Sequence, residues 1–163
     1  KEGNSMNKDY SFEVIKKEMC FVGKITYEDY SFGIENDIKC KENIFGLYIG
    51  YTKLVFPINT KIAIWFGGFN SYQFWNRKNL EFPQSIKGEL YIENEIDNID
   101  VKYVEDWPTY YDKEKNIVCI GDYNINNNDI AVEFCENIIA VLEEKYLKAI
   151  WIKNIEFVDD VKI

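Results

Sequence analysis

The chain has 163 residues, 47% of them hydrophobic and 17% aromatic. That is enough for one domain that buries about 70% of the surface its unfolded chain would expose. Its formal net charge of −9 disfavours binding to a nucleic-acid backbone, and the absence of histidine excludes Ser-His-Asp triads, Cys-His dyads and histidine-ligated zinc sites.

The N-terminal part of the chain contains one ambiguous segment. Residues 1–5 (KEGNS) resemble the remnant of an expression tag, so we expect a single domain over residues 6–163. In SFEVIKKEMCFV (11–22), the apolar residues recur at helical spacing, but a strand fits almost as well.

A β-hairpin is predicted next. IFGLYIGYTKLVF (44–56) and TKIAIWFGGF (60–69) are rich in β-branched and aromatic residues, and a proline-containing turn separates them. Gly67 and Gly68 are expected to end the second strand or to form a bulge in it.

The aromatic segment FNSYQFWNRKN (69–79) follows and contains Arg77, the only arginine of the chain. Aromatic rings beside a cation can stack on bases or sugars. One arginine in an acidic chain offers little to a nucleic acid. We therefore expect a packed loop or short helix that lends Tyr72 or Trp75 to a protein interface.

A second hairpin is predicted from SIKGELYIENEI (85–96) and IDVKYVED (99–106), which both alternate apolar and polar residues around an Asp-Asn turn. Its carboxylates have three interpretations: a solvated acidic edge, an interface for a basic partner, or a catalytic pair. As an interface, the contact residues would be Glu93, Glu95, Asp97, Asp100, Glu105 and Asp106.

The segment WPTYYD (107–112) follows these acids. Tyr and Trp are enriched at interface hot spots, so Tyr110 and Tyr111 are further candidates for partner contacts. The alternative is that this proline-bent loop packs on the core. NIVCIGDY (116–123) then contains a continuous apolar run typical of a central strand buried on both faces.

The C-terminal stretch over residues 129–146 fits two structures. Its apolar residues recur at i+4 spacing, as in a helix, but they also alternate, as in strands. As strands, the apolar arms IIAVL and LKAIWI form a meander around the polar EEKY. We prefer the strands and keep the helix open, and 149–157 is a strand in either case.

These elements predict an α+β, β-rich domain, built on a mostly antiparallel twisted sheet with one or two helices packed on it. The candidate helices are 11–22, 70–80 and 129–145.

Little in the sequence indicates catalysis or a cofactor. Cys20, Cys40, Cys119 and Cys135 lack CxxC spacing. Cys119 and Cys135 stand within apolar runs, so we expect buried, reduced thiols there. Phosphate-loop and dinucleotide motifs and an 18-residue apolar run are absent, and we expect no signal peptide. We predict a cytoplasmic protein with no catalytic residues, no metal and no cofactor.

Two C-terminal stretches, CIGDYNINNND (119–129) and ENIIAVLEEKYLKAIWIKNIEF (136–157), resemble segments of the immunity proteins of polymorphic and contact-dependent bacterial toxin systems. The resemblance implies a protein that binds a cognate toxin domain, often a basic nuclease, and occludes its active site. Acidic residues would then take the place of nucleic-acid phosphates, and charge would speed association.

Two other functions stay open. The first is a small-ligand or carbohydrate-binding β module that uses Trp65, Tyr72 and Trp75 as a stacking platform. The second is a carboxylate-dependent hydrolase, which requires two acids that converge in a pocket with separated pKa values.

Overall fold

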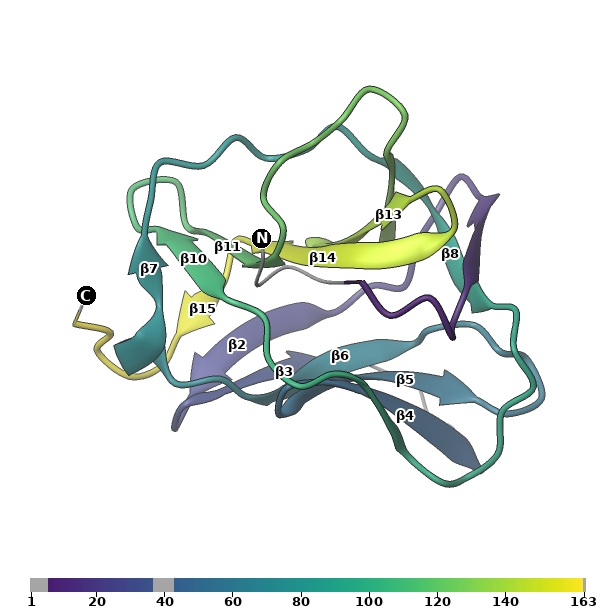
Figure 1. Cartoon of the computed structure of the whole chain (residues 1–163). Helices are drawn as coiled ribbons and strands as arrows, with labels where there is room; N and C mark the ends of the chain where they lie inside the picture. Colours follow the sequence, from purple (N-terminus) through teal and green to yellow (C-terminus); the bar gives the residue numbers. More distant parts are fainter. Residues whose placement is uncertain (1–5, 37–42, 163) are drawn as a thin grey trace.

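The computed structural model describes residues 6–36 and 43–162, and these residues form two β-sheets that face each other (Figure 1). Most neighbouring strands are antiparallel, but β7–β10, β8–β12, β2–β15 and β4–β9 pair in parallel, so both sheets are mixed. The predicted residue 1–5 tag and Cys40 lie outside the described residues.

The larger sheet has eight strands. In spatial order they are β1 (Phe12–Lys16), β8 (Ile86–Ile92), β12 (Ile130–Cys135), β13 (Ile138–Glu143), β14 (Tyr146–Lys153), β11 (Ile117–Gly121), β10 (Thr109–Asp112) and β7 (Asn76–Arg77). Its centre is the meander β12–β13–β14, which confirms the strand interpretation of the C-terminal stretch. The strand β11 is buried along its whole length, as its apolar run predicts.

The smaller sheet has seven strands. In spatial order they are β15 (Glu156–Phe157), β2 (Lys24–Glu28), β3 (Ser31–Glu35), β6 (Trp65–Phe69), β5 (Thr52–Pro57), β4 (Ile44–Ile49) and β9 (Val101–Val104).

The main core lies between the sheets. Large side chains such as Phe56 and Phe66 of the smaller sheet and Phe134 and Ile150 of the larger sheet are fully buried in it. At about 25 cal/mol per Å² of apolar surface, this burial is the main stabilising contribution to the fold.

A second, smaller core covers the opposite face of the eight-stranded sheet. Its largest member is Trp151 of β14, whose ring meets that of Phe82 edge-on at 5.9 Å between centroids. Phe82 belongs to the 78–85 connection, and Tyr123 of the 122–129 loop packs against the same cluster. Figure 1 shows both connections on the side of this sheet that faces away from the smaller one.

The predicted α+β class is wrong, because the described residues are almost entirely β and contain only one 3₁₀ turn, η1 (Tyr72–Phe74). Of the candidate helices, 11–22 contributes β1, 70–80 contributes η1 and β7, and 129–145 contributes β12 and β13. Helical spacing in 11–22 is outweighed by the pairing of β1 with β8.

Both predicted hairpins also need correction. The apolar run 44–56 is itself a hairpin, since β4 and β5 turn at Gly50 and Tyr51. The acidic hairpin does not form, because β8 lies in the larger sheet and β9 in the smaller one. Residues 93–100 cross between the sheets instead of making a tight turn.

Within the described residues, no helix has the length and apolar character needed to cross a bilayer.

Candidate functional site

One end of the smaller sheet carries exposed aromatic side chains. The β2–β3 turn presents Tyr30 and the β4–β5 turn presents Tyr51, while β6 ends at Phe69. The spatial order β2–β3–β6–β5–β4 places Phe69 between these two turns, since Ser31 pairs with Phe69 and Thr52 pairs with Gly68.

The four rings of this end form a continuous series, which we call the aromatic row: Tyr51, Phe69, Tyr30 and Tyr72. Tyr51 meets Phe69 edge-on at 6.2 Å, and Phe69 lies 6.3 Å from Tyr30. Tyr30 stacks on Tyr72 at 5.5 Å with an interplanar angle of 2°. Tyr51 is 73% exposed, Phe69 49% and Tyr30 36%. Adjoining exposed rings of this kind mark a binding surface more often than single exposed apolar residues do.

Local backbone conformations place these rings. Gly50 has φ +61° and allows the two-residue turn that presents Tyr51. Gly68 has φ +123°, and a side chain there would lie 2.5 Å from the Tyr51 carbonyl, so only glycine allows this close approach. In the β2–β3 turn, Asp29 and Tyr30 both have positive φ, of 55° and 66°. Tyrosine is strained in that region.

Buried side chains support the aromatic row from below. The Tyr27 hydroxyl donates to the Asn70 carbonyl at 2.7 Å and accepts from the Tyr72 amide at 2.9 Å. Burial raises the pKa of Tyr27 far above its usual range, so this phenol stays protonated and keeps both bonds. The Asn70 side chain accepts from the Trp75 indole at 2.8 Å and donates to the Thr109 hydroxyl at 2.9 Å. These hydrogen bonds therefore hold the segment that carries Tyr72 and Trp75 against Tyr27 and Thr109.

A cleft of about 350 Å³ lies beside the aromatic row and contains residues of both sheets. Its apolar lining includes Ile49, Trp107 and Ile120. Tyr51 and Phe69 also line it, and so do Glu105 and Asp106, two exposed carboxylates that we call the acidic rim.

The predicted contact residues separate into groups. Glu105 and Asp106 reach the cleft, but Glu93 and Glu95 pair with Lys145 at 3.4 Å and Lys61 at 3.8 Å. A hydrogen bond with the Ser11 side chain lowers the pKa of Glu93, and Lys145 lowers it further.

The other two predicted carboxylates make local backbone contacts. Asp97 accepts from the Ile99 amide at 3.0 Å, and Asp100 accepts from the Gly46 amide at 2.9 Å. These acids are therefore not gathered on one strand pair, as the hairpin predicted.

The predicted aromatic contacts lie mostly inside the protein. Trp75 and Tyr111 are only 6% and 4% exposed, and their rings meet at 5.2 Å within the main core. Tyr110 packs edge-on against Tyr123 at 4.8 Å on the outer face of the larger sheet. Trp75 supports the aromatic row but is not presented on the surface.

Sequence reasoning missed Tyr30 and Tyr51. The available signals were the Asp-Tyr and Gly-Tyr pairs at positions 29–30 and 50–51, each of which interrupts an alternating run. Asp and Gly favour turns, so both pairs could have been recognised as hairpin ends.

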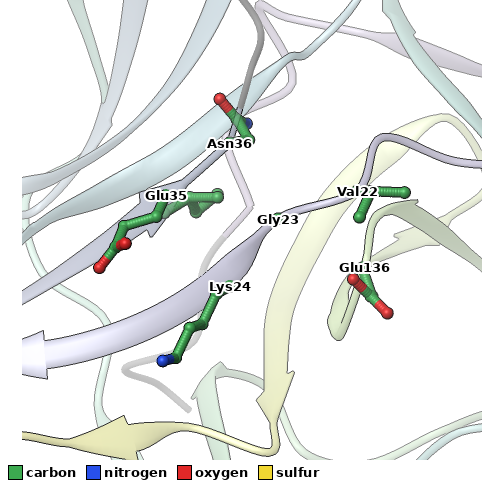
Figure 2. Close-up of a pocket in the computed structure, with 7 residues that line it drawn as sticks. Val22, Gly23, Lys24, Glu35, Asn36 and Glu136 are labelled. Carbon is green, nitrogen blue, oxygen red and sulfur yellow. The ribbon is translucent and has the colours of Figure 1, made fainter.

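A second, wider depression of about 940 Å³ lies near the start of β2, and Figure 2 shows the residues around it. Lys24, which lines it, forms an ion pair with Glu156, with 2.5 Å between Nζ and Oε1. Glu35 and Glu136 are exposed on different elements, β3 and the β12–β13 turn. Because its charged groups are either paired or exposed on separate elements, we place the candidate site at the aromatic row.

Metal ligands do not gather in the described part of the chain, which contains no group of three or more Cys, Asp or Glu side chains able to hold an ion. Of the thiols there, Cys119 and Cys135 are buried and Cys20 is half-buried, and all three are unpaired. Burial raises the pKa of Cys135 to about 12, so this thiol is protonated near neutral pH.

The two sheets and the exposed row at their end define the class of this molecule: a two-layer, mixed β protein with an aromatic and acidic surface at one end. No protein-family model matches the sequence, and no curated protein is significantly similar to it.

Proposed function

We propose that this chain is a non-catalytic binding protein, specifically an immunity protein that neutralises a cognate bacterial toxin in the cytoplasm by occluding its active site. The observation that carries the proposal is the aromatic row beside the acidic rim. Tyr51 and Phe69 offer rings of the kind found at interface hot spots, and Glu105 and Asp106 favour a basic partner.

The charge of the whole chain supports the same partner chemistry. A net charge of −9 speeds the approach of a basic protein, and this effect weakens as salt is added. The C-terminal resemblance to immunity proteins points to a toxin, such as a nuclease, as that partner. The two resembling segments contain the end of β11, the 122–129 loop, β13, β14 and β15, and none of these carries a ring of the aromatic row.

The test is protection of cells. The toxin domain encoded beside this gene would be expressed under an inducible promoter, with and without this chain. We expect growth to be restored and the two proteins to purify as one complex whose association rate falls with salt. Continued growth arrest, together with no complex between the purified proteins, would contradict the proposal.

A carbohydrate-binding module is the second candidate, and the concave surface beside Tyr51 and Phe69 favours it. The platform predicted from Trp65, Tyr72 and Trp75 does not form, since Trp75 is buried. Trp107 lines the cleft, so its fluorescence should respond to a bound sugar. A flat titration across a set of glycans would rule this candidate out.

A further inference from the structure

A lysine side chain of this protein, Lys102, contacts the Tyr51 ring of the aromatic row. Lys102 on β9 places its Nζ 5.5 Å from the centroid of the Tyr51 ring and 3.7 Å from Glu105 Oε2. An ammonium group over an aromatic face and beside a carboxylate is stabilised by both. This end of the sheet therefore favours positive charge.

The contact made by Lys102 is weak. Its side chain is 40% exposed and that of Glu105 is 86% exposed, so water and salt compete with the pair. Asp106, the second carboxylate of the acidic rim, has no ion-pair partner within residues 6–36 and 43–162. Lys102 pairs with Glu105 alone and lines a neighbouring depression that shares Tyr51 with the cleft. The two carboxylates of the acidic rim therefore outnumber it, and the local charge stays negative.

The cleft suits a side chain with an apolar stem and a charged head. Its volume of about 350 Å³ is near the lower end of the range for small-molecule sites. Ile49, Trp107 and Ile120 can cover methylene groups, while the acidic rim and the Tyr51 ring can receive the charge. A planar guanidinium both stacks on an aromatic ring and pairs with carboxylates, so arginine fits better than lysine.

We propose that this cleft is a binding subsite for an arginine side chain of the partner protein, which displaces Lys102 from Tyr51 and Glu105. The identity of the partner rests on the proposed function, whereas the chemistry of the subsite does not. Lys102 then acts as a competitor that weakens binding, and its loss strengthens the complex.

The subsite can be tested without the partner. The ¹⁵N-labelled chain would be titrated with N-acetyl-arginine N-methylamide, and with the citrulline analogue as a control of nearly the same shape without the charge. We expect the arginine compound to shift the amide signals of Gly50, Tyr51, Glu105 and Asp106. The citrulline compound should leave them in place.

Substitution of Lys102 tests whether this lysine competes with the arginine compound, because its removal should then raise the affinity. Lys102→Met keeps the stem and removes the charge, so it should tighten binding of the arginine compound about fivefold. Lys53→Met is the matched control, because Lys53 Nζ lies 5.6 Å from the Tyr48 ring on the same sheet. Glu105→Gln combined with Asp106→Asn should weaken binding at least fivefold, and unchanged signals elsewhere in the spectrum would show that the fold is kept.

Equal shifts with the citrulline compound, or weaker binding by Lys102→Met, would overturn the subsite. The same Lys102→Met variant should also tighten the complex with the purified toxin domain. If the toxin binds but neither the arginine compound nor Lys102→Met has an effect, the subsite fails and the proposed function stands. If the arginine compound binds the cleft and no toxin binds the chain, the proposed function fails and the subsite stands.

Discussion

Lys148 and Asp129 form an ion pair that is almost completely shielded from water. Lys148 Nζ lies 2.5 Å from Asp129 Oδ2, and the two side chains are only 1% and 2% exposed. Asp129 ends the 122–129 loop and Lys148 belongs to β14, while the Asp122 amide donates to the Lys148 carbonyl at 3.0 Å. Lys148 thus binds both ends of this loop to the larger sheet, one through its side chain and the other through its backbone carbonyl.

Removal of one partner of this pair should be costly. Asp129→Asn leaves the Lys148 charge buried with only Glu143, 3.5 Å away, and we expect a loss of about 3 kcal/mol in the free energy of unfolding. Urea denaturation would measure it. The double variant Lys148→Met, Asp129→Leu should recover most of the loss, since it leaves no buried charge unpaired and Glu143, which loses Lys148, is 42% exposed to water.

The surface pair Lys24–Glu156 is the control for this experiment. It has the same 2.5 Å separation, but its side chains are 57% and 51% exposed. Glu156→Gln should leave the urea midpoint almost unchanged. If Asp129→Asn also left the urea midpoint unchanged, the buried pair would not stabilise the protein.

Asp112 should make the stability of the protein depend on acid pH. Its pKa is lowered below the ordinary 3.8, chiefly by a hydrogen bond from the Leu80 amide at 2.9 Å, and further by the Lys115 amide. A lowered pKa in the folded state means that the stabilisation is fully present above 3.8 and disappears as the pH falls through the folded-state pKa.

The matching variant is Asp112→Asn. It should lower the free energy of unfolding by about 1 kcal/mol at pH 7, because the Leu80 and Lys115 amides bond to different carboxylate oxygens and asparagine offers only one acceptor oxygen. This difference from the unmodified chain should narrow below pH 4. Denaturation midpoints measured from pH 7 to pH 2.5 would show the trend. Glu114→Gln, an exposed change nearby, should not alter it, and a difference that stays constant with pH would exclude this role for Asp112.

The aromatic row should dominate the binding of a protein partner. Tyr51→Ala and Phe69→Ala are each expected to weaken the complex about 30-fold, the effect of losing a hot-spot ring of about 2 kcal/mol. Tyr51 is largely exposed, so its loss should change the free energy of unfolding little. Calorimetric titration would give both affinities. Ile125→Ala, an exposed apolar change on the 122–129 loop, is the control, and equal affinities for all three variants would place the interface elsewhere.

The left-handed backbone conformation of Tyr30 should lower the stability of the folded protein. Its φ of 66° is unfavourable for any residue with a Cβ, by about 1 kcal/mol. Tyr30→Gly and Tyr30→Ala both remove the ring that stacks on Tyr72, so they differ mainly in this backbone term. Tyr30→Gly should therefore unfold at higher temperature than Tyr30→Ala. Both should bind the partner more weakly than the unmodified chain does. Equal melting temperatures would argue against strain in this turn.

Much of the larger sheet could be predicted from local patterns. The run NIVCIGDY predicts a strand buried on both faces, and the apolar arms around EEKY predict the β13–β14 hairpin. These predictions succeed because a continuous apolar run must be covered on both sides, wherever it lies in the fold. Burial of Cys119 and Cys135 follows from the same runs.

Long-range pairing could not be predicted in this way. Alternation along β8 and β9 shows that each strand has one buried face. It does not show to which sheet each strand belongs or which residues pack on that face. The two strands therefore fit a hairpin as well as they fit two separate sheets, and the structure places them in separate sheets. The helical spacing in 11–22 was misleading for a related reason, since pairing of β1 with β8 outweighs a weak local preference.

The candidate site depends most on tertiary structure. The sequence by itself determined an acidic, aromatic, strand-rich chain without histidine chemistry, because composition and local runs do not depend on folding. Only the tertiary structure decided that Trp75 lies in the core and Tyr51 on the surface. An aromatic side chain gains by burial wherever partners surround it, and those partners come from strands distant in the sequence. The row of Tyr51, Phe69, Tyr30 and Tyr72 exists because sheet order brings three separate segments to one end.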